Sequence, residues 1–290
     1  MITPPTEPSR EDIAQHYDSL DVFYREVWGD HLHHGYWITG RETTPEAIRN
    51  LTTAVADLAR ISRSDTVIDV GCGYGAASIW LAEHLGAKVS GVTLSSQQCI
   101  EAKILAEQLP AGIPKPEFIC ADWLDNDLPD ASVDAIISIE CLSHIPDKAA
   151  FFKEVARVLK PGGRLGLCDW LAKEQPAPWE KRHLLEPICH DGHLAELCNA
   201  EELRELALEA GLKVREFREV GRHVRKTWRV ITARLCAKLI TKQDYRKFLI
   251  ENLQSDRVFA LTITRLIAAY ATGALNYGLL GAEKITANDT

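Results

Sequence analysis

The chain has 290 residues, 46% of them hydrophobic, and its 41 acidic against 33 basic side chains leave a net charge of -8. This length allows one large core with a lid, whereas the acidic balance argues against a nucleic-acid binder. No apolar run approaches the roughly 18 residues of a membrane span, and residues 1–10 are polar and proline-rich rather than a signal peptide, so we expect a soluble, cytoplasmic protein.

The eight cysteines favour reduced thiols over disulfides or zinc ligands. None forms a C-x-x-C pair, and most lie within apolar segments, where free cysteine is commonly buried.

An N-terminal arm, residues 1–40, is dense in aromatic side chains: Tyr17, Phe23, Tyr24, Trp28, Tyr36 and Trp37. It suits a flap over a flat or apolar ligand, and equally a helical arm that uses these rings as anchors to the body. Histidines at 31, 33 and 34 raise the question of a metal, but adjacent His33 and His34 would point opposite ways on an extended chain. Metal ligands also need fixed geometry and usually a carboxylate or thiolate partner, so we predict no metal site.

The first regular helix is predicted over residues 44–60, with Thr44 as its N-cap and Pro45 in its first turn. A β-prone run at 66–70 follows and leads into Gly71, Gly73 and Gly75. An apolar period of 3.6 comes next, which indicates strand, tight turn and helix. Such a turn lets backbone approach a ligand closely, and the helix N-terminus favours an anionic group.

The glycine spacing separates two classes of ligand. A dinucleotide fingerprint would place its third glycine at Ala76 and an acidic residue about twenty positions on. Here the spacing is G-x-G-x-G, with Asp69 near the end of the strand. This pattern disfavours an NAD-dependent oxidoreductase.

The next strand, predicted over 88–92, ends without an acidic residue for ribose hydroxyls. A threonine hydroxyl and a glutamine amide can make the same hydrogen bonds without charge, and Thr93 and Gln98 follow this strand. Ser95 with Gln98 has the form of a capping box, so a helix is predicted from there to about residue 109.

A third strand is predicted over 116–120 and is followed by Asp122 and Trp123. A carboxylate here can accept from an adenine amino group, and an indole can cover the purine face. The alternative for Asp122 is a turn or helix cap.

A fourth strand is predicted over 133–139, and the loop after it carries Glu140 and His144. Ligands lie outside the carboxyl ends of strands in open α/β sheets, so this loop should face the reacting groups. A helix over 148–159, the turn Lys-Pro-Gly-Gly and a fifth strand over 165–168 complete a pattern typical of a parallel sheet with helices on both faces.

The C-terminal third departs from this alternation. Residues 171–199 have the composition of a lid and include His190 and His193, after which a helix over 200–210 and a strand over 212–220 are predicted. Residues 222–270 read as helical and basic, either a solvated face or a patch for an anionic substrate group or membrane surface. A last strand is predicted over 275–282.

Several of these motifs together resemble one family. The segments DVGCGYG, GVTLS, SIE with His144 and Pro146, LKPGG, and HHGY in the arm are similar to those of class I S-adenosylmethionine (SAM) methyltransferases. Within them the chain resembles the tocopherol methyltransferase-like group, related to sterol C-methyltransferases and cyclopropane fatty acid synthases.

The resemblance implies a Rossmann-like, doubly wound α/β fold. It implies a seven-stranded sheet of order 3-2-1-4-5-7-6, in which the last strand in sequence is an antiparallel edge. The expected units are the arm over 1–40, a SAM-binding core over 41–170, a lid over 171–199, and the end of the core over 200–290 with a helical insertion at 222–270.

The resemblance also implies roles for residues. SAM would be held by Tyr17, Asp69, Gly71, Gly73, Gly75, Thr93, Gln98, Asp122, Trp123 and Ile139. His144 is hypothesised as general base, with Glu140 orienting the donor or the acceptor. The acceptor pocket would be formed by Tyr24, Trp28, His34, Tyr36, Trp37, His190 and His193.

We therefore expect a SAM-dependent methyltransferase that acts on a small, lipophilic isoprenoid or aromatic acceptor, at carbon. Methylation of a small amine or alkaloid nitrogen is the nearest alternative, and a SAM-binding protein without turnover is the alternative of another class. The acceptor, the methylated atom and the oligomeric state are not determined by the sequence.

Overall fold

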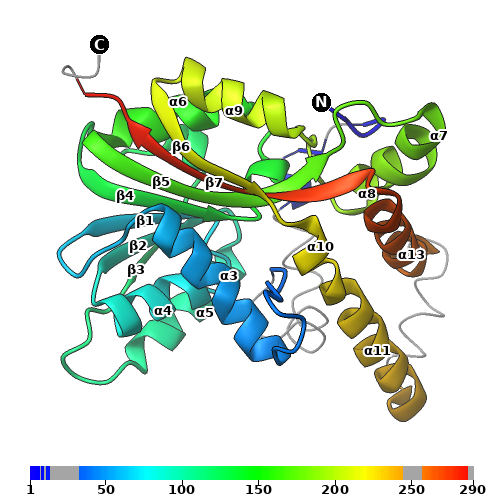
Figure 1. The fold of residues 1–290 in the computed structure, drawn as a ribbon. Helices are drawn as coiled ribbons and strands as arrows, with labels where there is room; N and C mark the ends of the chain where they lie inside the picture. Colours follow the sequence, from blue (N-terminus) through cyan, green and yellow to red (C-terminus); the bar gives the residue numbers. More distant parts are fainter. Residues whose placement is uncertain (7, 10, 14–32, 244–256, 287–290) are drawn as a thin grey trace.

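The computed structural model describes residues 1–6, 8–9, 11–13, 33–243 and 257–286. Its centre is one seven-stranded sheet of order β3-β2-β1-β4-β5-β7-β6 (Figure 1). The strands are β1 (Thr66–Val70), β2 (Lys88–Thr93), β3 (Glu117–Cys120), β4 (Val133–Ile139), β5 (Leu159–Ala172), β6 (Leu212–Glu219) and β7 (Leu275–Lys284). The predicted order is confirmed.

Helices cover both faces of the sheet (Figure 1). On one face lie α3 (Thr44–Leu58), α4 (Ala76–Leu85) and α5 (Ser96–Glu107), and on the other lie α6 (Lys148–Val158) and α9 (Ala200–Glu209). The alternation of side chains along the central strands builds a core on each side, since Val67 and Ile137 belong to one buried cluster and Ile68 and Ile136 to the other.

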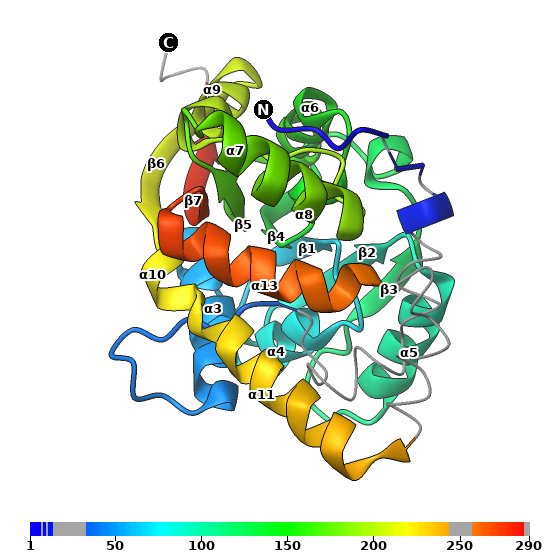
Figure 2. The same cartoon turned by 90° about the vertical axis from the view of Figure 1, so that its right-hand side faces the viewer.

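A third group of helices gathers at the carboxyl ends of the parallel strands (Figures 1 and 2). It comprises α7 (Pro178–Glu180), a π-helical turn (Lys181–Leu185), α8 (Glu186–Asp191), α10 (Gly221–Val224), α11 (Lys226–Thr241) and α13 (Arg257–Thr272). Residues 178–191 of the predicted lid are therefore helical. Asp191 ties it to α13, because its Oδ2 accepts hydrogen bonds from Arg265 at 2.8 Å and Thr262 at 2.5 Å.

Three local predictions were wrong. The N-cap of α3 is Thr43 rather than Thr44, because Thr43 and Glu46 form a reciprocal capping box and Pro45 takes the second helical position. Strand β5 begins at Leu159, so the Lys-Pro-Gly-Gly segment lies within it. Strand β7 is antiparallel as expected, but it pairs with both β5 and β6, and β6 is the edge.

All eight cysteines are free thiols, although Cys120 and Cys236 are exposed rather than buried. Within the described ranges, none of the helices combines the length and apolar content needed to cross a bilayer.

Candidate active site

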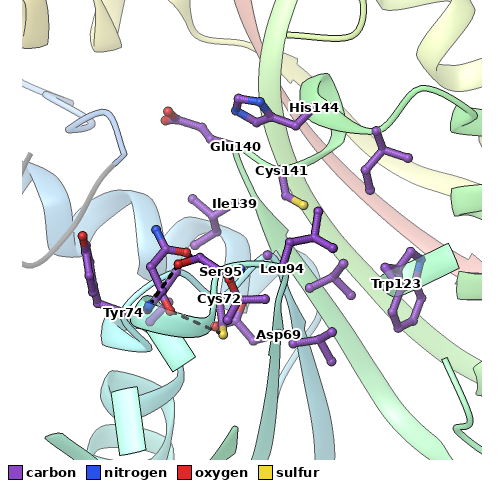
Figure 3. Close-up of a pocket in the computed structure, with 18 of the residues that line it drawn as sticks. Asp69, Cys72, Tyr74, Leu94, Ser95, Trp123, Ile139, Glu140, Cys141 and His144 are labelled. Atoms are coloured by element: carbon purple, nitrogen blue, oxygen red, sulfur yellow. Dashed lines mark hydrogen bonds between the residues drawn. The ribbon is translucent and has the colours of Figure 1, made fainter. Parts of the chain in front are cut away.

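A cavity opens at the carboxyl ends of β1, β2, β3 and β4, where the sequence placed the ligand (Figure 3). The glycine turn between β1 and α4 forms its floor. Gly71, Gly73 and Gly75 have φ values of +75°, +54° and +77°, in the left-handed region that favours glycine. A Cβ at Gly71 would lie 2.4 Å from Cys141, whereas one at Gly73 would meet no atom within 4 Å.

The turn leads into the N-terminus of α4, where Gly75 is an N-cap that supplies no side-chain hydrogen bond. The N-cap residue itself therefore takes up none of the backbone amides of the first helical turn, although the Ser78 amide interacts with the Asp69 carboxylate. A helix N-terminus of this kind suits a carboxylate or phosphate group.

Asp69 lines the cavity from the end of β1. Its Oδ2 accepts a hydrogen bond from the Ser78 hydroxyl at 2.6 Å. Burial raises the pKa of Asp69 to about 6, against the opposing effect of that hydrogen bond. The carboxyl group is thus prepared to interact with a cationic or hydroxyl-bearing ligand.

Thr93 and Gln98 are brought together at the end of β2. The Thr93 hydroxyl donates to Gln98 Oε1 at 2.9 Å, and both side chains are buried in the cavity wall. This contact orients the amide so that its NH2 group is the remaining donor. Ser95 caps α5 by accepting from the Gln98 amide at 3.0 Å.

Asp122 and Trp123 also line the cavity, at the end of β3. The Asp122 carboxylate caps the short helix Trp123–Asp125 by accepting from the Leu124 amide at 2.8 Å, so the helix-cap alternative applies to at least one of its oxygens. Trp123 is 3% exposed, and its Nε1 donates to the Phe151 carbonyl at 3.4 Å.

Ile139, the last residue of β4, lines the cavity together with Glu140, Cys141 and His144 of the segment that follows (Figure 3). Nδ1 of His144 lies 3.0 Å from the carbonyl oxygen of His193. A carbonyl can only accept, so Nδ1 carries the proton and Nε2 is the basic nitrogen. Burial lowers the pKa of His144 to about 4, which keeps the ring neutral at physiological pH.

The lid holds this loop in place. The Ser143 carbonyl accepts from the amides of Ala195 at 2.9 Å and Glu196 at 3.3 Å, and the Ser143 amide donates to Asp169 at 2.8 Å. Buried Lys148 contributes a hydrogen bond to the Ile145 carbonyl at 3.0 Å and an ion pair with Glu196 at 3.4 Å.

Glu140 does not have the environment of a proton acceptor. Burial alone would raise its pKa, but the charge of His34 and hydrogen bonds from His34 lower the pKa to about 2. Cys141 is equally unsuited to nucleophilic chemistry, since burial raises the pKa of its thiol to about 12.

The described members of the predicted acceptor pocket do not line this cavity. His34 is buried against Glu140 at 2.9 Å, while its neighbour His33 lines the cavity. Tyr36 and Trp37 pack into the body, Tyr36 against the His223 ring and Trp37 beneath the Lys226 ammonium group. Neither ring lines this cavity, and their assignment to an acceptor pocket stays a prediction.

The two lid histidines differ. His193 reaches the site through its carbonyl oxygen, whereas the His190 side chain is exposed next to Asp191 at 3.2 Å. Tyr17, Tyr24 and Trp28 lie outside the described residues.

Several residues that line the cavity were not predicted: Ile13, His33, Tyr74, Leu94 and Cys141. Part of the signal for His33 was present in the sequence, because adjacent histidines on an extended segment point to opposite sides, so that His33 and His34 were expected to have different surroundings. Among the described residues no group of three histidine, cysteine or acidic side chains is arranged to hold a metal ion.

Comparison with known proteins agrees with this geometry. A family described as "Methyltransferase domain" matches residues 68–167, which run from β1 into β5. The 27-O-demethylrifamycin SV methyltransferase of Amycolatopsis mediterranei is 30% identical over 96% of this chain and 99% of its own length. The chain belongs to the class I SAM-dependent methyltransferases.

Two further proteins extend the comparison. The chloroplastic tocopherol O-methyltransferase of Arabidopsis thaliana is 29% identical over 96% of this chain and 83% of its own length. The geranyl diphosphate C-methyltransferase of Streptomyces coelicolor, solved with S-adenosyl-L-homocysteine (SAH), has a TM-score of 0.73 at 19% identity over 97% of this chain and all of its own. The latter likeness concerns the fold alone.

SAM is the cofactor of this methyltransferase, and the described residues fit it. The open space above Gly73 accommodates a ligand where any other residue would place a Cβ. Paired Thr93 and Gln98 offer uncharged polar groups beside it, and the apolar side chains of Leu94 and Ile139 suit an adenine ring and a methionine chain.

Proposed function

We propose that this methyltransferase transfers the methyl group of SAM to a hydroxyl oxygen of a small lipophilic acceptor, such as a phenol, with His144 as general base. The observation that carries the proposal is the hydrogen bond from His144 Nδ1 to the His193 carbonyl. Because this bond fixes the proton on Nδ1, Nε2 is the basic nitrogen of a side chain that lines the cavity. A hydroxyl becomes a good nucleophile when such a base accepts its proton.

Oxygen replaces carbon as the favoured atom because of the relatives. Two relatives that match nearly the whole chain carry names that refer to oxygen, an O-demethylated rifamycin and a tocopherol O-methyltransferase. Transfer to carbon is the second candidate. It is supported by the motifs in the sequence and by a fold shared with a geranyl diphosphate C-methyltransferase.

Transfer to nitrogen receives less support. An amine acceptor is cationic near neutral pH and is normally bound through a nearby anion. Glu140 is the carboxylate placed beside His144, and its two oxygens already accept hydrogen bonds from His34, Trp170 and Tyr277.

SAM supplies an activated methyl group when it is bound, and the chain's own contribution is binding, alignment and exclusion of water. We assign the glycine turn, Asp69, the Thr93–Gln98 pair, Asp122 and Trp123 to SAM binding, together with Ile139. His144 takes the acceptor's proton on Nε2 while the His193 carbonyl keeps Nδ1–H in place.

The test is incubation with SAM carrying a 13C-labelled methyl group and a panel of lipophilic phenols, prenylated hydroquinones and tertiary amines. The carbon chemical shift of the product distinguishes methyl on oxygen, carbon and nitrogen. Oxygen methylation that is lost in His144→Ala supports the proposal. Methylation of carbon alone, or SAH formation that is unchanged in His144→Ala, contradicts it.

The same assay tests the alternative that this chain binds SAM without turnover. That alternative predicts SAM binding, seen as a rise in melting temperature, without SAH formation from any acceptor in the panel.

A further inference from the structure

The carboxylate of Glu140 is saturated by hydrogen bonds from three separate parts of the chain. Its Oε1 accepts from the His34 amide at 2.7 Å, from His34 Nδ1 at 2.9 Å and from the Tyr277 hydroxyl at 2.7 Å. Its Oε2 accepts from Trp170 Nε1 at 3.3 Å. In Figure 3 the carboxylate points away from Asp69 and the glycine turn.

This arrangement is held at a conformational cost. Glu140 has a φ of +54°, which is uncommon for a residue with a side chain and costs of order 1 kcal/mol or more. The rings of Trp170, Trp228, Tyr270 and Tyr277 surround His34 at centroid distances between 5.2 and 6.0 Å. His34 is therefore shielded from water, and charge-assisted hydrogen bonds are strong in such surroundings.

The partner of Glu140 belongs to a short segment, residues 33–37, that is fastened at every peptide group beyond His33. Gly35 donates to the Thr227 hydroxyl at 3.1 Å, Tyr36 to the Ala47 carbonyl at 2.7 Å and Trp37 to the His223 carbonyl at 3.0 Å. The hydrogen bond nearest to His33 is the one that the His34 amide donates to Glu140. His33 itself is 8% exposed, lines the cavity, and donates from Nδ1 to the His34 carbonyl at 2.8 Å.

We propose that Glu140 is a positioning residue, whose buried carboxylate fixes His34 and thereby holds the His33 imidazole in the wall of the SAM cavity. Glu140 then acts on ligand binding through His33 and takes no proton during methyl transfer. This assignment replaces the direct orientation of the donor or the acceptor by Glu140 that the sequence suggested, and it is independent of the acceptor.

The test uses SAH as the probe, so that it does not depend on finding the acceptor. Glu140→Gln keeps the shape of the side chain but places an NH2 group against donors, which removes one acceptor and the charge. We expect SAH to dissociate about tenfold faster from Glu140→Gln, as measured by stopped-flow fluorescence, and amides 34–37 to lose protection in hydrogen–deuterium exchange.

A double-mutant cycle with His33→Ala identifies the route of the effect. If Glu140 acts through His33, the double variant releases SAH no faster than the more severe single variant. The proposal would be overturned if the two substitutions had multiplicative effects on the rate of SAH release, or if Glu140→Gln released SAH at the wild-type rate.

Two further variants keep the test decisive. Glu180→Gln is the matched control, because Glu180 is 4% exposed and accepts from the Ala177 amide at 2.7 Å but does not line the cavity, and its SAH release should be unchanged. If Glu140→Gln does not fold, Tyr277→Phe removes a single donor to Oε1, and faster SAH release from that variant is the expected result. An unchanged rate there counts against the proposal.

Discussion

The imidazole of His144 and the backbone carbonyl of His193 meet across 49 positions of sequence, with 3.0 Å between Nδ1 and the oxygen. The contact joins the loop after β4 to the lid, and the lid contributes a main-chain atom rather than a side chain. Substitution of the two histidines should therefore have very different effects.

We expect His144→Ala to lower kcat by about 100-fold or more, the usual contribution of a general base. His193→Ala should keep kcat within about threefold of wild type, because its carbonyl remains. The measurement is SAH production at saturating SAM and acceptor. Equal losses in both variants would mean that the His193 side chain itself takes part.

The pH dependence of turnover is a second prediction. A general base works when it is deprotonated, and burial lowers the pKa of His144 to about 4. We therefore expect kcat to stay on its plateau down to about pH 5 and to fall as the pH approaches 4. A rate that halves near pH 6.5 would show that the essential base is not a buried histidine of this kind. The rates should be recorded over short times. The activity that is recovered after return to pH 7 is the control for acid damage.

Two glycines of the turn provide a matched pair. Gly71→Ala and Gly73→Ala both place a side chain at positive φ, but only at Gly71 would the new Cβ collide with Cys141, at 2.4 Å. We expect Gly71→Ala to lower the free energy of unfolding by about 3 kcal/mol or more and Gly73→Ala by about 1 kcal/mol.

For the affinity for SAM, the informative variant is Gly73→Ala. Gly73 lines the cavity, and the new Cβ of Gly73→Ala would meet no protein atom within 4 Å. This variant should therefore remain folded and bind SAM at least about tenfold more weakly. Urea unfolding and calorimetric titration with SAM measure the two quantities. Wild-type affinity in folded Gly73→Ala would contradict the placement of SAM above this turn.

The stability of the ligand-free protein should depend on the carboxyl group of Asp69. Burial raises its pKa to about 6 from a value near 4 in the unfolded chain. The native state then holds a proton that the unfolded state loses between pH 4 and pH 6, so the free energy of unfolding falls as the pH rises through this window. The full loss is on the order of 3 kcal/mol.

Asp69→Asn removes this titration while keeping an oxygen that can accept from Ser78. The difference in unfolding free energy between wild type and variant should therefore favour wild type most at pH 4 and shrink toward pH 6, since other groups cancel in the comparison. A difference that grows with pH would reverse the assigned direction of the pKa shift.

The parts of the site that follow from local pattern were predictable. Strand β4 begins and ends at the expected residues, and the glycine turn and the Thr93–Gln98 pair lie at strand ends. The topology of an open α/β sheet brings those ends together. The arm was less predictable, because the direction of a side chain on an extended segment changes with each residue and no periodicity marks its register.

Glu140 illustrates the same limit for a single side chain. Its position after β4 was evident, but its conformation at positive φ and its partners, drawn from β5, β7 and residue 34, depend on contacts far apart in sequence. Position alone therefore suggested that Glu140 orients the donor or the acceptor directly, whereas its contacts favour positioning of the segment that carries His33.

The Ser143 carbonyl, which accepts from Ala195 and Glu196, has a consequence for how substrate range can change in this protein. A replacement lid taken from another methyltransferase would alter the shape available to the acceptor and, through the same two amides, the placement of His144. We therefore expect that a change in the lid alters both the choice of acceptor and the rate of methyl transfer. Chimaeras that exchange the lid should retain residues 193–196 if they are to remain active.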